Sequence, residues 1–195
     1  MSVIVKKTCI GLTGRMASGK GEAVRILQEH GFEYASLSDI VRCEAEKEGA
    51  GVTRNRMQDI GNRLRSQGGA GVLGRMIREK IAASAASRWV IDGIRNPAEV
   101  LELRKLEGFS LVAIESRVEV ILERLKRRGR AGDDLSEREL RAALEREWGC
   151  NEPAGGQQVG PAAAMADFTV FNDGTLAELK ARLEAVLKEI GVVHE

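Results

Sequence analysis

Short apolar runs alternate along the chain with longer segments in which apolar residues recur at every third or fourth position. The short runs predict five β-strands, at residues 3–13, 33–37, 88–92, 110–115 and 168–171. The longer segments predict eight helices, at residues 20–30, 39–48, 54–67, 71–86, 97–106, 117–128, 136–148 and 175–190. Strands that alternate with helices are typical of an α/β domain with a mainly parallel sheet.

Two regions hold more helix than a simple alternation needs. Residues 38–87, between the second and third strands, carry two or three helical segments where one crossover helix would be enough, so we expect a helical insertion there. A second region, residues 124–148, is rich in arginine. The stretch 149–160 has the composition of a loop.

Length and composition fit a single domain over residues 1–195, because hydrophobic residues at 43% can supply a core. The formal net charge of +1 argues against binding a nucleic acid polymer, so any anion site must be local. The apolar runs are too short for a membrane helix and the start lacks a signal-peptide pattern, so we expect a cytoplasmic protein with no membrane partner. Cys9, Cys43 and Cys150 are widely spaced, which fits reduced thiols better than a zinc site.

The strongest local motif is GRMASGKGE, in which Gly14, Gly19 and Lys20 satisfy the pattern G-x-x-x-x-G-K between a strand and a helix. Glycines let backbone N–H groups surround a phosphate chain, the helix offers its positive end, and the lysine adds a cation. The alternative is a glycine-rich turn with a surface lysine. The residues of this predicted phosphate loop are Gly14, Arg15, Met16, Ala17, Ser18, Gly19, Lys20, Gly21 and Glu22.

The motif departs from its usual form at Gly21, where most phosphate loops have Ser or Thr. No hydroxyl is present there to bind Mg²⁺ directly, so a metal would be held by phosphate oxygens and by carboxylates acting through water. Glu22 could join that outer shell, or it could simply lie in a first helical turn, where the helix dipole favours a negative charge.

The GKG form of the motif resembles the nucleoside monophosphate kinase group, of which adenylate kinase is the best known. The form GKGE is similar to adenylate-kinase-like and dephospho-CoA-kinase-like proteins, and this resemblance runs over nearly the whole chain. It implies a three-layer α/β P-loop NTPase fold with a five-stranded parallel sheet in the order 2-3-1-4-5. It also implies a helical acceptor-binding insertion, a short lid at about 124–148, and ATP with Mg²⁺ as the phosphoryl donor.

Two segments resemble the acceptor side of adenylate kinases. SLSDIVR is similar to the STGDMLR stretch of that family, with Ser36, Asp39 and Arg42 matching in order and spacing. The resemblance implies that Arg42 grips an acceptor phosphate, and we expect Ser38 and Asp39 to bind the acceptor as well. The spacing alone puts Asp39 and Arg42 on one face of a helix. The alternative is a helix cap at Ser38 or Asp39 followed by a solvated arginine.

The third strand ends in VIDGIR, which resembles the DGFPR element of the same family. The resemblance implies that Asp92 orients the water shell of magnesium and that Arg95, one residue out of register, clamps the acceptor. A carboxylate at the carboxyl edge of a parallel sheet lies where such folds bind ligands, although a plain turn aspartate is the alternative. Gln157 and Gln158 could reach the base of an acceptor as amide donors and acceptors.

The arginine-rich segment resembles a donor-binding lid. Arg124 and Arg128, one helical turn apart, look like the family's pair at the donor base and phosphates, and Arg130 and Arg141 look like lid arginines that close over the transferring phosphoryl group. The alternative is a solvated helix in which glutamates neutralise neighbouring arginines. These glutamates are Glu137, Glu139, Glu145 and Glu147.

After the last strand, Asn172 and Gly174 are similar to the family's loop at the donor base, although a helix cap would use the same residues.

The sequence therefore predicts ATP-dependent transfer of the γ-phosphoryl group to a nucleoside or deoxynucleoside monophosphate, with small-molecule nucleotides as the partners. The predicted catalytic side chains are Lys20, Asp39, Asp92, Arg128, Arg130 and Arg141. One alternative is a dephospho-CoA-kinase-like transfer to a hydroxyl, with Asp39 as the base. Another is a nucleotide-binding switch or partner protein with little kinase activity.

Overall fold

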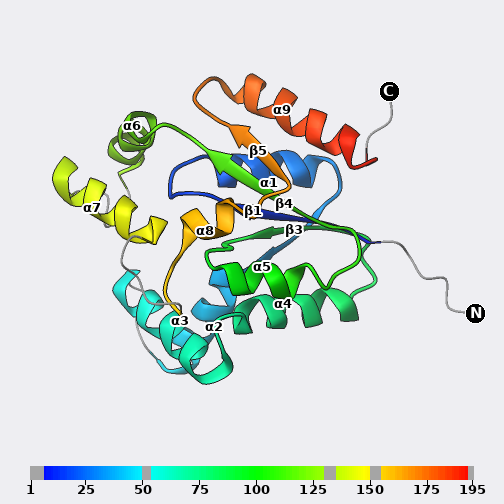
Figure 1. Ribbon diagram of the computed structural model, residues 1–195, viewed down its shortest axis with the longest axis horizontal. Coiled ribbons are helices and arrows are strands. Elements are labelled where there is room, and N and C mark those ends of the chain that lie inside the picture. Colours follow the sequence, from blue (N-terminus) through cyan, green and yellow to red (C-terminus); the bar gives the residue numbers. More distant parts are fainter. Residues whose placement is uncertain (1–6, 50–53, 130–134, 150–154, 193–195) are drawn as a thin grey trace, which may run out of the picture.

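The sheet has five parallel strands, and a computed structural model describes the chain over residues 7–49, 54–129, 135–149 and 155–192. The strands are β1 (Thr8–Thr13), β2 (Glu33–Ser36), β3 (Arg88–Asp92), β4 (Phe109–Glu115) and β5 (Phe168–Phe171). They lie in the order β2-β3-β1-β4-β5 (Figure 1). This confirms the predicted sheet and its order. The predicted start of the first strand at residue 3 lies outside the described residues, and Lys7 precedes the strand.

The helices follow the predicted alternation with one addition. They are α1 (Lys20–Glu29), α2 (Leu37–Lys47), α3 (Arg54–Gly68), α4 (Val72–Ala83), α5 (Pro97–Leu103), α6 (Val118–Arg128), α7 (Glu137–Trp148), α8 (Val159–Ala163) and α9 (Leu176–Glu189). The short helix α8 was missed, because five residues are too few to display a helical period. None of the helices in the described part of the chain is long and apolar enough to cross a membrane.

Helices cover both faces of the sheet, so the domain has three layers (Figure 1). Helices α1 and α9 lie on one face and α4 and α5 on the other. Because side chains alternate along a strand, Cys9 of β1 belongs to the core on the α4 face while Ile10 belongs to the core under α1. Both faces are buried, which explains the almost continuous apolar runs of the sequence.

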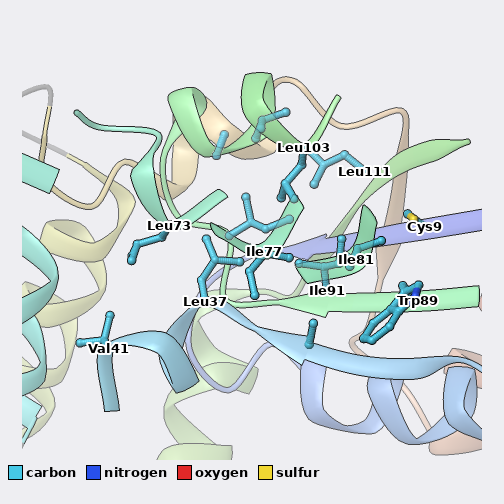
Figure 2. Close-up of a cluster of buried hydrophobic side chains, with 14 of the residues drawn as sticks. Cys9, Leu37, Val41, Leu73, Ile77, Ile81, Trp89, Ile91, Leu103 and Leu111 are labelled. Atoms are coloured by element: carbon cyan, nitrogen blue, oxygen red, sulfur yellow. The ribbon is translucent and has the colours of Figure 1, made fainter. Parts of the chain in front are cut away.

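The core on the α4 face joins the sheet to the helices between β2 and β3. Figure 2 shows Ile81 of α4 beside Ile91 of β3 and Ile77 of α4 beside Leu37, and Leu73 of α4 belongs to the same cluster. Helices α2 and α3 extend this layer past the carboxyl ends of the strands, as Figure 1 shows. They therefore stand beside the sheet edge where ligands bind in open α/β folds.

A third core fixes α7 against the phosphate loop. Leu140 and Leu144 of α7 pack in one cluster with residues of α6. The loop residues Met16 and Ala17 pack against the same cluster. Its members from α6 are Ile121, Leu122 and Leu125, with Val118 packed against them. The loop, α6 and α7 are thus parts of one packed unit.

Candidate active site

The phosphate loop connects β1 to α1, and its two glycines have conformations that other residues rarely adopt. Gly14 has φ +134° and Gly19 has φ +110°. A Cβ atom on Gly14 would collide with the carbonyl oxygen of Ile114, and one on Gly19 would collide with the side chain of Asn172. Both positions therefore need glycine for their backbone angle and for the close approach of their neighbours.

Lys20 begins α1 and turns back over the loop. Its Nζ donates hydrogen bonds to the carbonyl oxygens of Gly14 at 2.7 Å and Arg15 at 2.8 Å. Burial lowers the pKa of Lys20, and the nearby carboxylates of Asp92 and Glu147 oppose this shift. The ammonium group thus lies at the centre of the loop, where an anion would stabilise its charged form.

ATP binding is expected to take up protons at alkaline pH. Lys20 has a lowered pKa, so it loses its proton at a lower pH than an ordinary lysine, and a bound polyphosphate would raise the pKa again. Calorimetric titration of ATP in two buffers of equal pH but different ionisation enthalpy measures the uptake, which should grow as pH rises. A Lys20→Met variant should show none, and equal heats in both buffers would contradict the prediction.

Two of the predicted donor-side residues, Arg124 and Asn172, contact each other and the phosphate loop. Arg124 Nη2 donates to the carbonyl oxygen of Asn172 at 2.8 Å, and its Nη1 lies 3.3 Å from that of Ser18. Asn172 is buried and donates from Nδ2 to the same Ser18 oxygen at 2.8 Å. Gly174 directly precedes Thr175, which caps α9. Arg124 and Asn172 therefore hold the loop against the end of β5.

The predicted metal residues lie at different distances from Lys20. Asp92, at the end of β3, accepts a hydrogen bond from the Gly93 amide and is close enough to Lys20 to influence its pKa. Glu22 instead pairs with Arg25 at 2.6 Å. No cluster of three His, Cys, Asp or Glu side chains that could hold a metal occurs within the described ranges. Of these two carboxylates, Asp92 is therefore the one near Lys20 that could hold the water shell of a metal bound to phosphates.

A cavity of about 320 Å³ lies beside the phosphate loop, between it and helices α2, α3, α4 and α7. Met16 of the loop forms part of its wall, and so do Ser38 and Arg95 from the predicted acceptor set. The remaining wall residues are Leu37, Val41, Met57, Gly61, Arg65, Leu73, Gly93, Leu135, Ala143, Arg146, Glu147 and Gln157. Apolar side chains thus form much of the wall, and arginines and one glutamate supply its charges.

Arg42 does not line this cavity. Its Nη1 pairs with Asp39 Oδ1 at 2.7 Å on the surface of α2, where both side chains are half exposed. The helix cap is Ser36, whose hydroxyl accepts from the amide of Ser38, so the predicted cap at Ser38 or Asp39 is wrong by two or three residues. The structure therefore does not bring Arg42 together with Arg95.

Arg65, and not Arg42, lies in the wall of the cavity, where it forms a buried ion pair with Glu99. Arg65 of α3 is 7% exposed, and its Nε and Nη2 donate to Glu99 Oε1 at 3.2 and 2.8 Å. The other carboxylate oxygen of Glu99 accepts from the amides of Arg95 and Asn96 at 2.9 and 3.1 Å. Burial raises the pKa of Glu99, whereas Arg65 and the Arg95 amide favour the charged form. Arg65 and Glu99 are not among the predicted site residues, although the spacing of Asn96 and Glu99 is that of a capping box.

Arg95 lines the cavity and forms an ion pair with a second buried carboxylate, that of Glu147. Its Nη1 donates to Glu147 Oε1 at 3.1 Å and to Gln157 Oε1 at 3.2 Å. The second oxygen of Glu147 accepts from the Met16 amide of the phosphate loop at 2.7 Å. Gln157 lines the cavity, while the backbone N–H of Gln158 donates to the Arg95 carbonyl oxygen at 2.7 Å and anchors the segment.

The predicted lid arginines separate into different environments. Arg128 ends α6 and is exposed. The burial of Lys20 is the main cause of its lowered pKa, and the positive charge of Arg128 adds to that shift. Arg141 pairs with Glu137 at 3.0 Å on the exposed side of α7 and does not line the cavity beside the phosphate loop, which fits the solvated-helix alternative. Arg130 lies outside the described residues.

Comparison with known proteins places this chain in a family. A model described as an AAA domain matches residues 13–141. A UPF0200 protein of Sulfurisphaera tokodaii is 33% identical over 93% of this chain and 96% of its own length, and one of Methanoculleus marisnigri is 35% identical over 93% and 96%.

Solved structures share the fold at low sequence identity. TT1252 from Thermus thermophilus has a TM-score of 0.60 at 22% identity and covers 94% of this chain and 98% of its own. Shikimate kinase from Aquifex aeolicus has a TM-score of 0.54 at 16% identity and covers 96% of this chain and 100% of its own. These likenesses establish a P-loop kinase-like fold, and the sequence matches show that the chain belongs to the UPF0200 family and carries an AAA domain.

Proposed function

We propose that this protein is an ATP-dependent phosphotransferase that phosphorylates a small acceptor bound in the cavity. The observation that carries the proposal is the position of Met16, which belongs to the phosphate loop and also forms part of the cavity wall. A polyphosphate held by the loop would therefore end beside a molecule held in the cavity. Phosphoryl transfer depends mainly on such positioning and on electrostatic stabilisation.

The charged side chains around Met16 suit that reaction. Lys20 and Arg128 would neutralise the phosphates on the donor side, and Arg95 would face the group in transfer from the cavity side. Mg²⁺ bound with ATP would supply further neutralisation, with Asp92 holding its water shell. Arg124 and Asn172, which brace the loop, would keep the donor site in shape.

The acceptor is proposed to be anionic, because Arg65, Arg95 and Arg146 all line the cavity and guanidinium groups bind phosphates and carboxylates in paired hydrogen bonds. The sequence favours a nucleoside or deoxynucleoside monophosphate. The position of Glu147 supports the alternative to a nucleoside monophosphate, which is an acceptor that reacts through a hydroxyl.

Release of ADP in a coupled assay, with thermal unfolding in parallel, tests the proposal. ATP at 100 times its dissociation constant should stabilise the protein by about 2.7 kcal/mol, and ADP release should depend on an added monophosphate or hydroxyl acceptor. Lys20→Met should lower the rate by about 10²-fold or more, since one electrostatic contact to the transition state is lost. Lys47→Met, on the exposed side of α2, is the matched control. A rate of ADP release that does not depend on any added acceptor would instead favour the nucleotide-binding switch.

A further inference from the structure

Glu147 is a buried carboxylate at the junction between the phosphate loop and the cavity. It is 3% exposed, yet it forms part of the cavity wall. Its Oε2 lies 2.7 Å from the Met16 amide and its Oε1 lies 3.1 Å from Arg95 Nη1. It therefore stands between the place of the donor phosphates and the arginine expected to meet the acceptor.

The surroundings of Glu147 hold it in this position. The next residue, Trp148, lies under the guanidinium of Arg15, which is 3.9 Å from the ring centroid. On α8, a Cβ atom added to Gly160 would come within 2.6 Å of the same ring, so Trp148 is packed between the loop and α8. One turn earlier, Leu144 is buried in the core formed with α6. Because α7 is fixed at this end, the backbone of Glu147 stays beside the loop, and the Met16 amide and Arg95 hold its carboxylate at the junction.

A fixed carboxylate here disfavours a phosphate oxygen as the nucleophile. A phosphate dianion would be repelled by Glu147 and would have to compete with it for Arg95. A hydroxyl group, in contrast, can donate a hydrogen bond to the carboxylate and be oriented towards the phosphate loop. Asp39, the base suggested by the sequence, is half exposed, paired with Arg42, and outside the cavity wall.

We infer that the acceptor is a small alcohol carrying an anionic group, and that Glu147 is the general base that takes the proton from its hydroxyl; this inference rests on the proposed phosphotransferase function. The hydroxyl oxygen forms a bond to the γ-phosphorus while the bond from that phosphorus to the β–γ bridging oxygen breaks. The hydroxyl proton passes to Glu147 and then to water, and ADP leaves. Arg65 and Arg146 elsewhere on the wall would bind the anionic group.

The first experiment uses water as the hydroxyl acceptor, so that no substrate need be known. Hydrolysis of ATP with Mg²⁺ alone is measured for the wild-type protein, Glu147→Gln, Glu147→Asp and Glu145→Gln. Glu147→Gln should slow hydrolysis about 10²-fold without weakening ATP binding, because a general base typically contributes 10²–10⁴-fold. Glu147→Asp should restore part of the rate. Glu145→Gln, on the exposed face of the same helix, should match the wild type. Equal rates for Glu147→Gln and the wild type would overturn the inference.

The second experiment identifies the bond that is formed. Phosphorus NMR follows ATP with a panel of nucleoside monophosphates and, separately, with glycerol 3-phosphate, shikimate and dephospho-CoA. A phosphate ester on an alcohol, lost in Glu147→Gln, supports the inference. A phosphoanhydride on a monophosphate overturns it while leaving the phosphotransferase function intact. Bound ATP that is neither hydrolysed nor transferred contradicts the proposed function itself, and the inference falls with it. Thermal unfolding with and without ATP checks that each variant is folded.

Discussion

Replacing Glu99 by glutamine is expected to lower the free energy of unfolding by about 3–5 kcal/mol, which is the usual cost of leaving one partner of a buried ion pair alone. Glu99 is fully buried, and its two oxygens accept hydrogen bonds from the Arg65 guanidinium and from two backbone amides. Glutamine has only one accepting oxygen, so the Arg65 charge would stay buried without its counter-ion. For a chain of this length the melting temperature should fall by roughly 10 °C.

The matched control for this prediction is Glu178→Gln. Glu178 occupies the same third position of a capping box, in α9, as Glu99 does in α5, but it is exposed. Glutamine can keep the capping hydrogen bond, so this variant should unfold within about 0.5 kcal/mol of the wild type. Denaturant unfolding measures both. Equal stability of the two variants would mean that the ion pair of Arg65 contributes little and that Glu99 acts only as a cap.

The parts of the molecule predicted correctly are those whose signals are local in the sequence. The phosphate loop is one continuous motif from Gly14 to Lys20, and a strand before it and a helix after it leave little choice of geometry. The sheet order came from the resemblance that this motif carries. The start of α2 was placed two residues late, because Ser36, Ser38 and Asp39 are all good caps and sequence alone does not rank them.

The parts that were missed depend on contacts between distant residues. Glu99 lies 34 positions from Arg65, and Glu147 lies 131 positions from Met16. Helical spacing gives the face on which an arginine lies, but it does not say which of many arginines meets a cavity wall. Arg42 matched a family motif and lies on the surface beside Asp39. Arg65 matched none and is buried in the wall, because α3 packs its Gly61 side against α2 and leaves room for the guanidinium.

Replacing Gly19 by alanine is expected to damage both folding and nucleotide binding. The added methyl group would meet the buried side chain of Asn172, and alanine would have to adopt φ near +110°. Left-handed strain costs about 1–3 kcal/mol and overpacking about 1–3 kcal/mol more, so the free energy of unfolding should fall by about 2–6 kcal/mol. Movement of Asn172 would also release the Ser18 carbonyl oxygen that it binds, so the loop amides would no longer converge on a phosphate.

Gly21→Ala separates these effects from the general loss of a glycine. Gly21 lies two residues further on, in the first turn of α1, where an added Cβ would meet nothing within 4 Å and the backbone is helical. Alanine there should raise the free energy of unfolding by about 0.5 kcal/mol, because it restricts the unfolded chain at no steric cost. Unfolding curves and ATP titrations of both variants test the contrast. A Gly19→Ala protein as stable as Gly21→Ala would show that the loop can relax around a side chain, and that the close approach of Asn172 does not hold the loop in shape.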